Sequence, residues 1–419
     1  MPNVTNLPNR MEKQLPTELV TFMQIAGEVA YGRGQRLCLV GGVVRDLLLE
    51  LTNLDLDLVV EGDAINFAQQ LIQPEQGKIT THLRFNTAKL QWNNWSVDLA
   101  TARSETYAKP GVLPDVKPGS IDDDLFRRDF TINAMAIELS PNRYGELIDL
   151  CGGVDDLEHK LIRVLHDKSF TDDATRIWRG LRYEQRLDFQ LERNTLQLLK
   201  RDIPMLDIIS GDRIRHELEL VLKETLPEKP LRRAEELNVL QRLNSFLKAN
   251  GWLTETFKRA RQLSSLNLPP VGLYLALLTY SLTSEENERL LSRLRLSKPL
   301  SQILRDTISI KNKLQSLADP ELNPSDIYHV LHIYNPQAIM ANSIASDSTV
   351  AHRHIQLFLE KLRYIRPALT GDDLIRMGIA RGPNIKEILN MLHEARLDRE
   401  ITTKRDEEYF VNSWLSKNK

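Results

Sequence analysis

The sequence is poor in the features that mark exported and membrane proteins. Only two cysteines occur in 419 residues, Cys38 and Cys151, so we expect neither a disulfide framework nor a cysteine-ligated zinc site. The N-terminal segment MPNVTNLPNRMEKQLP has no apolar core. The longest apolar-rich run, VGLYLALLTYSL from Val271, is much shorter than the ~20 residues that span a bilayer. These absences predict a cytoplasmic protein that does not enter a membrane.

The chain also lacks an excess of charge of one sign. Lys and Arg number 55 against 57 Asp and Glu, for a net charge of −2, so a nucleic-acid partner would need a local basic surface. No fixed-period repeat or low-complexity tract occurs. With 42% hydrophobic residues, a chain of this length can bury more than one core, and we expect two or three domains.

The sequence pattern changes once, near residue 150. Before it, short β-rich runs alternate with polar turns, which predicts an α/β or α+β domain; the expected strands lie in 36–42, 54–62, 87–92, 95–102, 130–139 and 146–153. After residue 155, helical patterns separated by Pro and Gly dominate; the clearest lie in 172–187, 211–226, 230–250, 373–379 and 384–398. The second half should be nearly all helix.

A glycine pair follows the first expected strand. In LCLVGGVVRDLLLEL, Gly41 and Gly42 permit close backbone approach, and helical spacing resumes directly after them. Backbone N–H groups and a helix N-terminus would therefore meet at this turn, which suits a phosphate group. The same glycines are also compatible with an ordinary tight turn.

Three aspartates occur within apolar strands near this turn. Asp55 and Asp57 alternate with Leu54, Leu56 and Leu58, so the two carboxylates should share one strand face while the leucines face the core. Adjacent like charges favour a bound divalent cation, and hard oxygen ligands favour Mg²⁺. The alternative is a solvated Asp pair at a strand end. Asp98, in the apolar strand SVDLATAR, supplies a third carboxylate and favours a two-metal nucleotidyltransferase palm.

Four motifs in order resemble those of class II tRNA nucleotidyltransferases and the related bacterial poly(A) polymerases. They are LVGGVVRDLLL with LDLDLVV, RRDFTINAMAIEL (127–139), LIDLCGGVDDLEHKLIRV (147–164) and FTDDATRIWRGLRYEQRLDF (170–189). The resemblance covers roughly residues 35–250. It implies an α/β nucleotidyltransferase head with a polymerase-β-like palm, followed by an all-α neck, body and tail. The expected boundaries are an N-terminal extension at 1–35, the head at 36–155, the neck at 156–225, and a tRNA-binding body and tail at 226–419.

The resemblance also implies roles for individual residues. Asp55 and Asp57 would be the metal-binding carboxylates, with Asp98 as the third catalytic carboxylate. The residues implied in nucleotide binding fall into a triphosphate group (Gly41, Gly42, Arg45), a ribose and phosphate group (Arg128, Asp129, Asn133) and a helical group (Asp173, Arg176, Arg179). The chemistry of the RRDFTINA residues suits this, although an Asp-capped helix start is a simpler interpretation of the same stretch.

The segment DDATR is the most informative of the four motifs. Asp173 and Arg176 are spaced i, i+3, so they should be neighbours on one helix face, and an intrahelical ion pair is the simple interpretation. A carboxylate and a guanidinium can also pair with the edge shared by cytosine and adenine, whereas uracil and guanine reverse the donor and acceptor groups. Asp173 and Arg176 would then form an amino-acid template. The family usually has Glu-Asp-Pro here, and this chain has Asp172, Asp173 and Ala174, so Asp172 departs from the pattern.

These observations predict a template-independent enzyme that builds or repairs the 3′-terminal CCA of tRNA. It would use CTP, ATP or both with Mg²⁺, and the motifs do not distinguish CC, A and full CCA addition, so a complementary A- or CC-adding enzyme could act on the same tRNA. The alternatives are a bacterial poly(A) polymerase and a non-catalytic RNA-binding protein. The stretch between Asp98 and RRDF contains three prolines and two glycines, and we expect a structured but displaceable loop in which residues 103–120 govern A addition through Arg103 and Glu105.

Overall fold

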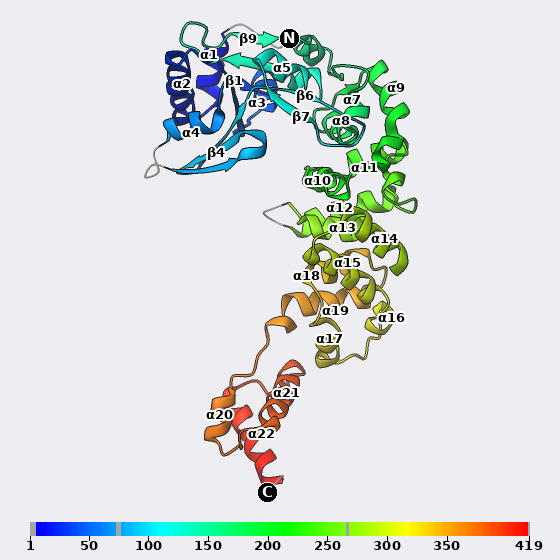
Figure 1. Cartoon of the computed structure of the whole chain (residues 1–419). Coiled ribbons are helices and arrows are strands. Elements are labelled where there is room, and N and C mark those ends of the chain that lie inside the picture. Colours follow the sequence, from blue (N-terminus) through cyan, green and yellow to red (C-terminus); the bar gives the residue numbers. More distant parts are fainter. Residues whose placement is uncertain (1–5, 73–76, 265–267, 418–419) are drawn as a thin grey trace. The chain divides into compact units, whose positions relative to one another are not determined.

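The computed structural model describes residues 6–72, 77–264 and 268–417 (Figure 1). Contacts divide the chain into two compact units. The first comprises residues up to 221 together with 236–242, and the second comprises 222–235 and 243 onward.

A mixed β-sheet forms the centre of the first unit. Within the described residues it has seven strands in the order β3-β4-β5-β2-β1-β8-β9. The β2–β5 pair is parallel, and the other neighbouring strands are antiparallel. The strands are β1 (Leu37–Val40), β2 (Leu56–Val60), β3 (Lys78–His82), β4 (Thr87–Trp92), β5 (Trp95–Thr101), β8 (Met135–Glu138) and β9 (Leu147–Asp149). All six expected strands are confirmed, and β3 is an addition.

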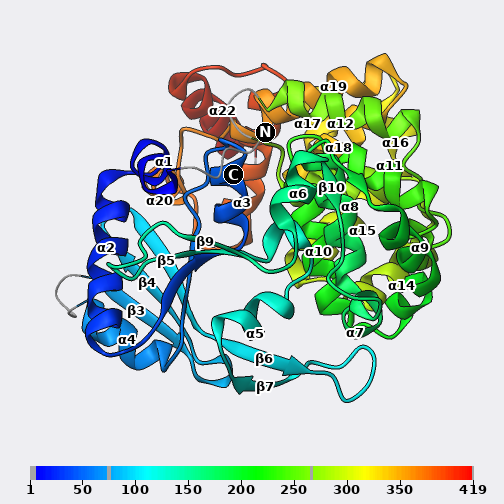
Figure 2. The same ribbon diagram turned by 90° about the horizontal axis from the view of Figure 1, so that it is seen from above.

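Helices cover one face of this sheet, where α2 and α4 lie against the strands (Figure 2). The head helices are α1 (Leu7–Gln14), α2 (Thr17–Gly32), α3 (Gly42–Leu48), α4 (Ala64–Leu71), α5 (Ile121–Phe126) and α6 (Gly153–Glu158), with 3₁₀ turns η1 (Leu83–Phe85) and η2 (Thr131–Asn133). On α5, Ile121 and Leu125 join a buried cluster with Cys38 and Val59, as expected for a small apolar cysteine.

One detail of the sequence-based interpretation is wrong. Leu54 does not face the core: it precedes β2 and is 42% exposed, whereas Leu56 and Leu58 are buried. The structured element expected at residues 103–120 is an antiparallel hairpin, in which β6 (Arg103–Thr106) pairs with β7 (Asp115–Pro118) before α5 begins.

Helices that follow the sheet complete the first unit. They are α7 (Ser169–Asp172), α8 (Thr175–Arg186), α9 (Arg193–Asp202), η3 (Ile203–Asp207) and α10 (Gly211–Leu222), with the short parallel pair β10 (Leu161–Ile162) and β11 (Gln190–Leu191). On α8, Ile177, Trp178 and Leu181 are completely buried, so this helix is anchored by an apolar stripe. The anchored stripe fixes the direction in which the polar face of α8 points.

The rest of the chain is helical, as expected. The helices are α11 (Glu228–Glu236), η4 (Leu240–Arg242), α12 (Gly251–Leu263), α13 (Val271–Leu278), α14 (Ser284–Leu294), α15 (Lys298–Lys311), α16 (Leu314–Leu317), α17 (Pro324–Leu331), α18 (Pro336–Ala345), α19 (Thr349–Glu360), η5 (Leu362–Tyr364), α20 (Gly371–Arg376), α21 (Pro383–Leu397) and α22 (Lys404–Lys417). The expected helix over 230–250 stops at Glu236, because Asn238 takes a left-handed conformation with φ 60°.

Candidate active site

The glycine pair forms a turn between β1 and α3. Gly41 has φ +79°, a conformation that favours glycine, and Gly42 begins the helix. A Cβ atom on Gly41 would lie 2.8 Å from Nη1 of Arg128 and 3.8 Å from Oδ2 of Asp57. The glycine therefore lets the backbone approach a carboxylate and a guanidinium at once, which is more specific than a simple tight turn.

The predicted carboxylates lie at neighbouring strands. Asp57 on β2 is directly paired with Asp98 on the parallel strand β5, so both side chains emerge on the same face. Burial and the negative charges of Asp55 and Asp98 raise the pKa of Asp57 to about 6. The charge of Arg128 opposes this rise. Asp98 makes an ion pair with Lys89 at 2.9 Å, and Asp55 is exposed just before β2.

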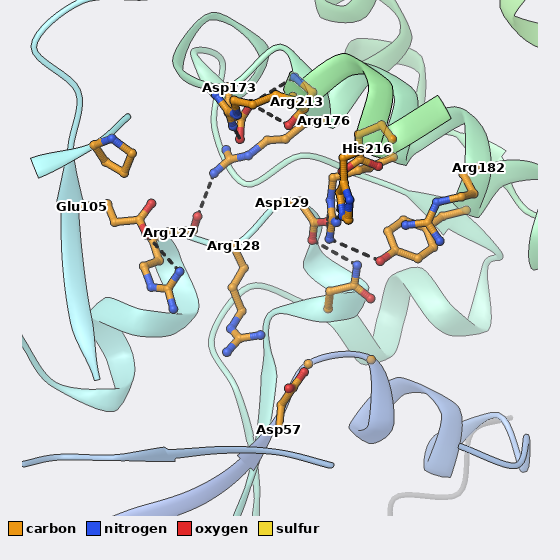
Figure 3. A pocket seen from close by; sticks show the side chains of 18 of the residues that line it. Asp57, Glu105, Arg127, Arg128, Asp129, Asp173, Arg176, Arg182, Arg213 and His216 are labelled. Carbon is orange, nitrogen blue, oxygen red and sulfur yellow. Dashed lines mark hydrogen bonds and ion pairs between the residues drawn. The ribbon is translucent and has the colours of Figure 1, made fainter. Parts of the chain in front are cut away.

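The RRDF motif surrounds a buried acid. Asp124 on α5 has no exposed surface, and its two oxygens accept hydrogen bonds from Arg127 at 2.6 Å and from Arg128 at 2.8 Å. Burial disfavours its ionised form, but the charges of Arg128 and Arg127 outweigh burial and lower the pKa of Asp124. This acid holds the two arginines in different directions, Arg127 toward Glu105 and Arg128 toward Asp57 (Figure 3).

A second buried network follows in the same motif. The carboxylate of Asp129 accepts from Arg179 on α8 at 2.8 Å and from Asn133 at 3.0 Å. Burial disfavours the charged form, but Arg179 and the Asn133 hydrogen bond outweigh it and lower the pKa of Asp129 to about 2. Arg45 donates to Asn133 at 2.7 Å and is itself held by the adjacent Asp46. The simpler interpretation of RRDFTINA as a capped α-helix start is wrong, since only the 3₁₀ turn η2 follows Asp129.

Asp173 and Arg176 lie at the start of α8 but do not pair with each other. Asp173 precedes the helix: its Oδ1 accepts from the backbone and hydroxyl of Thr175, and its Oδ2 accepts from Arg213 on α10 at 2.7 Å. Arg176 is buried and donates to Ser169 Oγ at 2.7 Å and to the carbonyl of Arg127 at 2.8 Å. The predicted shared helix face and the intrahelical ion pair are therefore both incorrect, and each side chain is oriented separately (Figure 3).

The β6–β7 hairpin is tied to these groups through one acid. Glu105 accepts from Arg103 at 2.8 Å, from Arg127 at 3.1 Å and from the hydroxyl of Tyr107 at 3.0 Å. Because the carbonyl of Arg127 accepts from Arg176, a continuous chain of contacts joins the hairpin to α8. Arg103 and Glu105, expected to act in coupling, are thus in contact with each other and with the RRDF motif.

One cavity of about 770 Å³ collects the predicted residues, all within the first unit. It is lined by Gly41, Gly42, Arg45, Asp55, Asp57, Arg128, Asp129, Asn133, Asp173, Arg176 and Arg179. Asp98 lines instead an adjoining cavity of about 340 Å³, which shares Asp57 and Arg128 with the first.

Sequence reasoning missed several residues of this cavity. Arg182, Arg186 and Arg213 add positive charge to its wall, and Phe85, Tyr107 and Tyr183 add aromatic rings. Arginines recur at 176, 179, 182 and 186 along one helix, and this spacing was a usable signal for Arg182 and Arg186. Arg213, far along the chain from its partner Asp173, left no such signal.

Three further observations concern the described residues. Within 6–72, 77–264 and 268–417, no three His, Cys, Asp or Glu side chains are grouped so as to hold a metal ion by themselves. No helix in the same ranges is long and apolar enough to cross a bilayer. Both cysteines are free thiols, as expected.

Comparisons with known proteins agree with this arrangement. A family model described as the poly A polymerase head domain matches residues 37–163, and one described as the probable RNA and SrmB-binding site of polymerase A matches residues 188–250. The A-adding tRNA nucleotidyltransferase of Halalkalibacterium halodurans is 34% identical over 98% of this chain and 96% of its own length. The A-adding enzyme of Geobacter sulfurreducens is 34% identical over 96% of this chain, which spans only 48% of that relative.

A solved structure shares the fold over nearly the whole chain. The Thermotoga maritima CCA-adding enzyme complexed with tRNA has a TM-score of 0.73 and 29% identity, covering 98% of both chains. Fold and site together define a nucleotidyltransferase with a helical C-terminal region. The chain belongs to the class II tRNA nucleotidyltransferase family.

Proposed function

We propose that this chain extends the 3′ end of tRNA without a nucleic-acid template, and that addition of the terminal adenosine is among its activities. The 3′-oxygen of the tRNA forms a bond to the α-phosphorus of the nucleotide, and the bond to pyrophosphate breaks. The observation that carries the proposal is the single cavity in which Asp57, Asp173 and Arg176 all lie. One nucleotide can therefore have its phosphates near the carboxylates and its base near Asp173 and Arg176.

Base choice follows from the separate orientation of Asp173 and Arg176. With Arg213 and Thr175 fixing its oxygens, Asp173 accepts a hydrogen bond from the exocyclic amino group of adenine or cytosine. Arg176 donates to the adjacent ring nitrogen. Guanine and uracil would place donors against donors and acceptors against acceptors in this buried site, a mismatch that can reject a substrate by a factor of about 10⁴.

The remaining cavity residues bind the phosphates and sugar. We assign Gly41, Gly42 and Arg128 to the triphosphate, and Asp129 to the ribose hydroxyls. Arg45, paired with Asp46 and Asn133, contributes positive charge beside the glycine turn and orients the Asn133 amide. Arg179 keeps Asp129 ionised, so that its carboxylate accepts hydrogen bonds from the sugar.

The carboxylates fit a divalent cation, and we propose Mg²⁺. Asp57 is half-buried beside Asp55 and Asp98, and its pKa is raised by burial first and then by these two negative charges, both of which a bound cation would offset. Two or three carboxylates are enough to bind Mg²⁺, because this ion is usually held by one or two carboxylates, and substrate phosphates and water complete its coordination shell. Asp55 and Asp57 would hold the ion, with Asp98 as the third carboxylate. Bound there, Mg²⁺ would activate the 3′-hydroxyl and neutralise charge on the leaving pyrophosphate.

Two features support the addition of the terminal adenosine in particular. The two relatives described above are both named A-adding enzymes, and their sequences align with nearly the whole chain. The ordered β6–β7 hairpin is tied through Glu105 and Arg127 to Arg176, which offers a path by which residues 103–120 adjust the pocket for a purine. A complementary CC-adding enzyme would then act earlier on the same tRNA, in the cytoplasm, where the two free cysteines stay reduced.

The test uses three tRNA transcripts, ending before CCA, after the first C and after CC, with labelled CTP and ATP supplied separately. We expect ATP incorporation on the transcript ending in CC, and CTP incorporation on the others if the enzyme adds CCA. Asp57→Asn serves as the inactive control. An enzyme that incorporates nothing into any transcript would contradict the proposal.

The family models favour one alternative, since their descriptions name poly(A) polymerase. An unstructured RNA included in the same assay separates the two activities. A polymerase of that kind would add many adenosines to both RNAs, whereas we expect the unstructured RNA to remain unextended and the tRNA to stop after its terminal A.

A further inference from the structure

A second open cavity adjoins the nucleotide pocket on the head. It measures about 670 Å³ and is built around the turn between β3 and β4, with Leu83, Arg84 and Phe85 on one wall and Arg103 of the hairpin on another. Leu83 is 83% exposed, the largest exposed fraction among the large apolar residues that the structure describes. An isolated exposed leucine is ordinary, but here it lies beside an aromatic ring in a cavity.

Two guanidinium groups lie close to the ring of Phe85. The Cζ atom of Arg84 is 5.3 Å from the ring centroid, and that of Arg103 is 5.2 Å away, both within the range of a cation–π contact. The orientation of Arg103 is fixed by its ion pair with the buried Glu105 at 2.8 Å. The ring and the two cations therefore form a preformed surface that suits an aromatic base carrying phosphates.

The cavities are joined by shared residues. Phe85 and Arg103 line the nucleotide pocket as well as this second cavity. Arg103 also lines the adjoining cavity of about 340 Å³, which is lined by Asp57 and Asp98. An RNA strand lying over Phe85 can thus continue past Arg103 to the carboxylates without passing Asp173 and Arg176.

We propose that Phe85, flanked by Arg84 and Arg103, is a stacking platform for the unpaired 3′-terminal base of the acceptor RNA. The inference rests on the proposed function, in which the incoming base is read by Asp173 and Arg176, so the base of the growing end needs a different site. Unpaired RNA bases commonly stack on aromatic and arginine side chains, without base-specific hydrogen bonds. Such a platform would accept the 3′ end after each addition.

The first test compares Phe85→Ala and Phe85→Trp with the wild-type enzyme in ATP addition to a tRNA ending in CC. Loss of one base stack predicts a rise in KM for tRNA of about 5- to 150-fold for Phe85→Ala, with the KM for ATP nearly unchanged. Phe85→Trp should retain the wild-type KM. Tyr31→Ala is the matched control, because Tyr31 is an exposed aromatic residue on α2, away from these cavities.

The second test removes the base instead of the ring, with a tRNA whose 3′-terminal nucleotide lacks its base but keeps its 3′-hydroxyl. If ring and base stack, wild-type enzyme and Phe85→Ala should have similar KM values for this RNA, since each change removes the same contact. A KM for intact tRNA unaffected by Phe85→Ala, or a defect of equal size on the base-free RNA, would overturn the platform while the wild type remains active. Wild-type inactivity on every RNA would overturn the proposed function and this inference with it.

Discussion

Arg213 provides a sharp test of how the base-reading pair is oriented. Its Nη2 donates to Oδ2 of Asp173 at 2.7 Å, and its side chain comes from α10, outside the motif that carries Asp173 and Arg176. Replacing it with Met keeps most of the side-chain length but removes the charge. Asp173 would then be held only through Oδ1, by Thr175.

A hydrogen bond between charged groups contributes about 1.5–3 kcal/mol, which corresponds to a factor of roughly 10 to 150. We therefore expect Arg213→Met to lower kcat/KM for ATP by this factor, and to lower the ratio of kcat/KM for ATP over GTP by a similar amount. Single-nucleotide addition to tRNA ending in CC, with each nucleotide supplied alone, measures both values. The change in the ratio distinguishes lost orientation from a general loss of activity.

The control is Arg215→Met, which removes the same charge from the same helix, where Arg215 pairs with Asp212 and Glu219. Its nucleotide preference should match the wild type. If Arg213→Met also keeps the wild-type ratio of ATP to GTP use, Asp173 does not depend on Arg213 for its orientation and the reasoning is refuted.

Three other predictions follow from the site. Asp57→Asn should lower turnover with either nucleotide about a thousandfold or more, while the amount of tRNA that the enzyme retains on filters stays unchanged. Chelation of divalent cations should lower turnover to the same extent. Substantial residual turnover in either case would argue against a metal site. Because Asp129 has a folded pKa of about 2, below its unfolded value, it stabilises the fold above ~pH 4 by about 2 kcal/mol, and this is lost as pH falls toward 2. Denaturant titration should show Asp129→Asn less stable than wild type at pH 6, with the difference shrinking below pH 4, and a pH-independent difference would contradict this. Replacing residues 108–113 at the hairpin tip with Gly-Ser should impair A addition more than any C addition, and equal loss would count against the coupling role.

The strands were predictable because their patterns are local. In β5, Val97, Leu99 and Thr101 are buried and alternate with Ser96, Asp98 and Ala100, as a half-buried strand requires. The same reasoning failed at Leu54, because Asp55 and the residues before it lie outside β2, where alternation no longer places a side chain in the core.

Tertiary contacts explain what the sequence did not reveal. The proline and glycine content of residues 103–120 indicated a structured loop, but not that it is a hairpin whose Glu105 is held by Arg127 at the C-terminal end of α5. The Asp173–Arg213 contact joins residues 40 positions apart, and the simple expectation of an i, i+3 pair ignored this competing partner. Charged side chains in such a site choose among many partners, so their pairing depends on the fold.

The central claim is that protein side chains select the base. The most direct measurement is a single reaction containing tRNA ending in CC and all four nucleoside triphosphates, with the product analysed by mass. Wild-type enzyme should give tRNA heavier by one adenosine monophosphate, and Arg176→Ala should give products that also contain guanosine or uridine. A wild-type product of mixed composition, or an Arg176→Ala enzyme that remains active and adds only adenosine, would contradict the account.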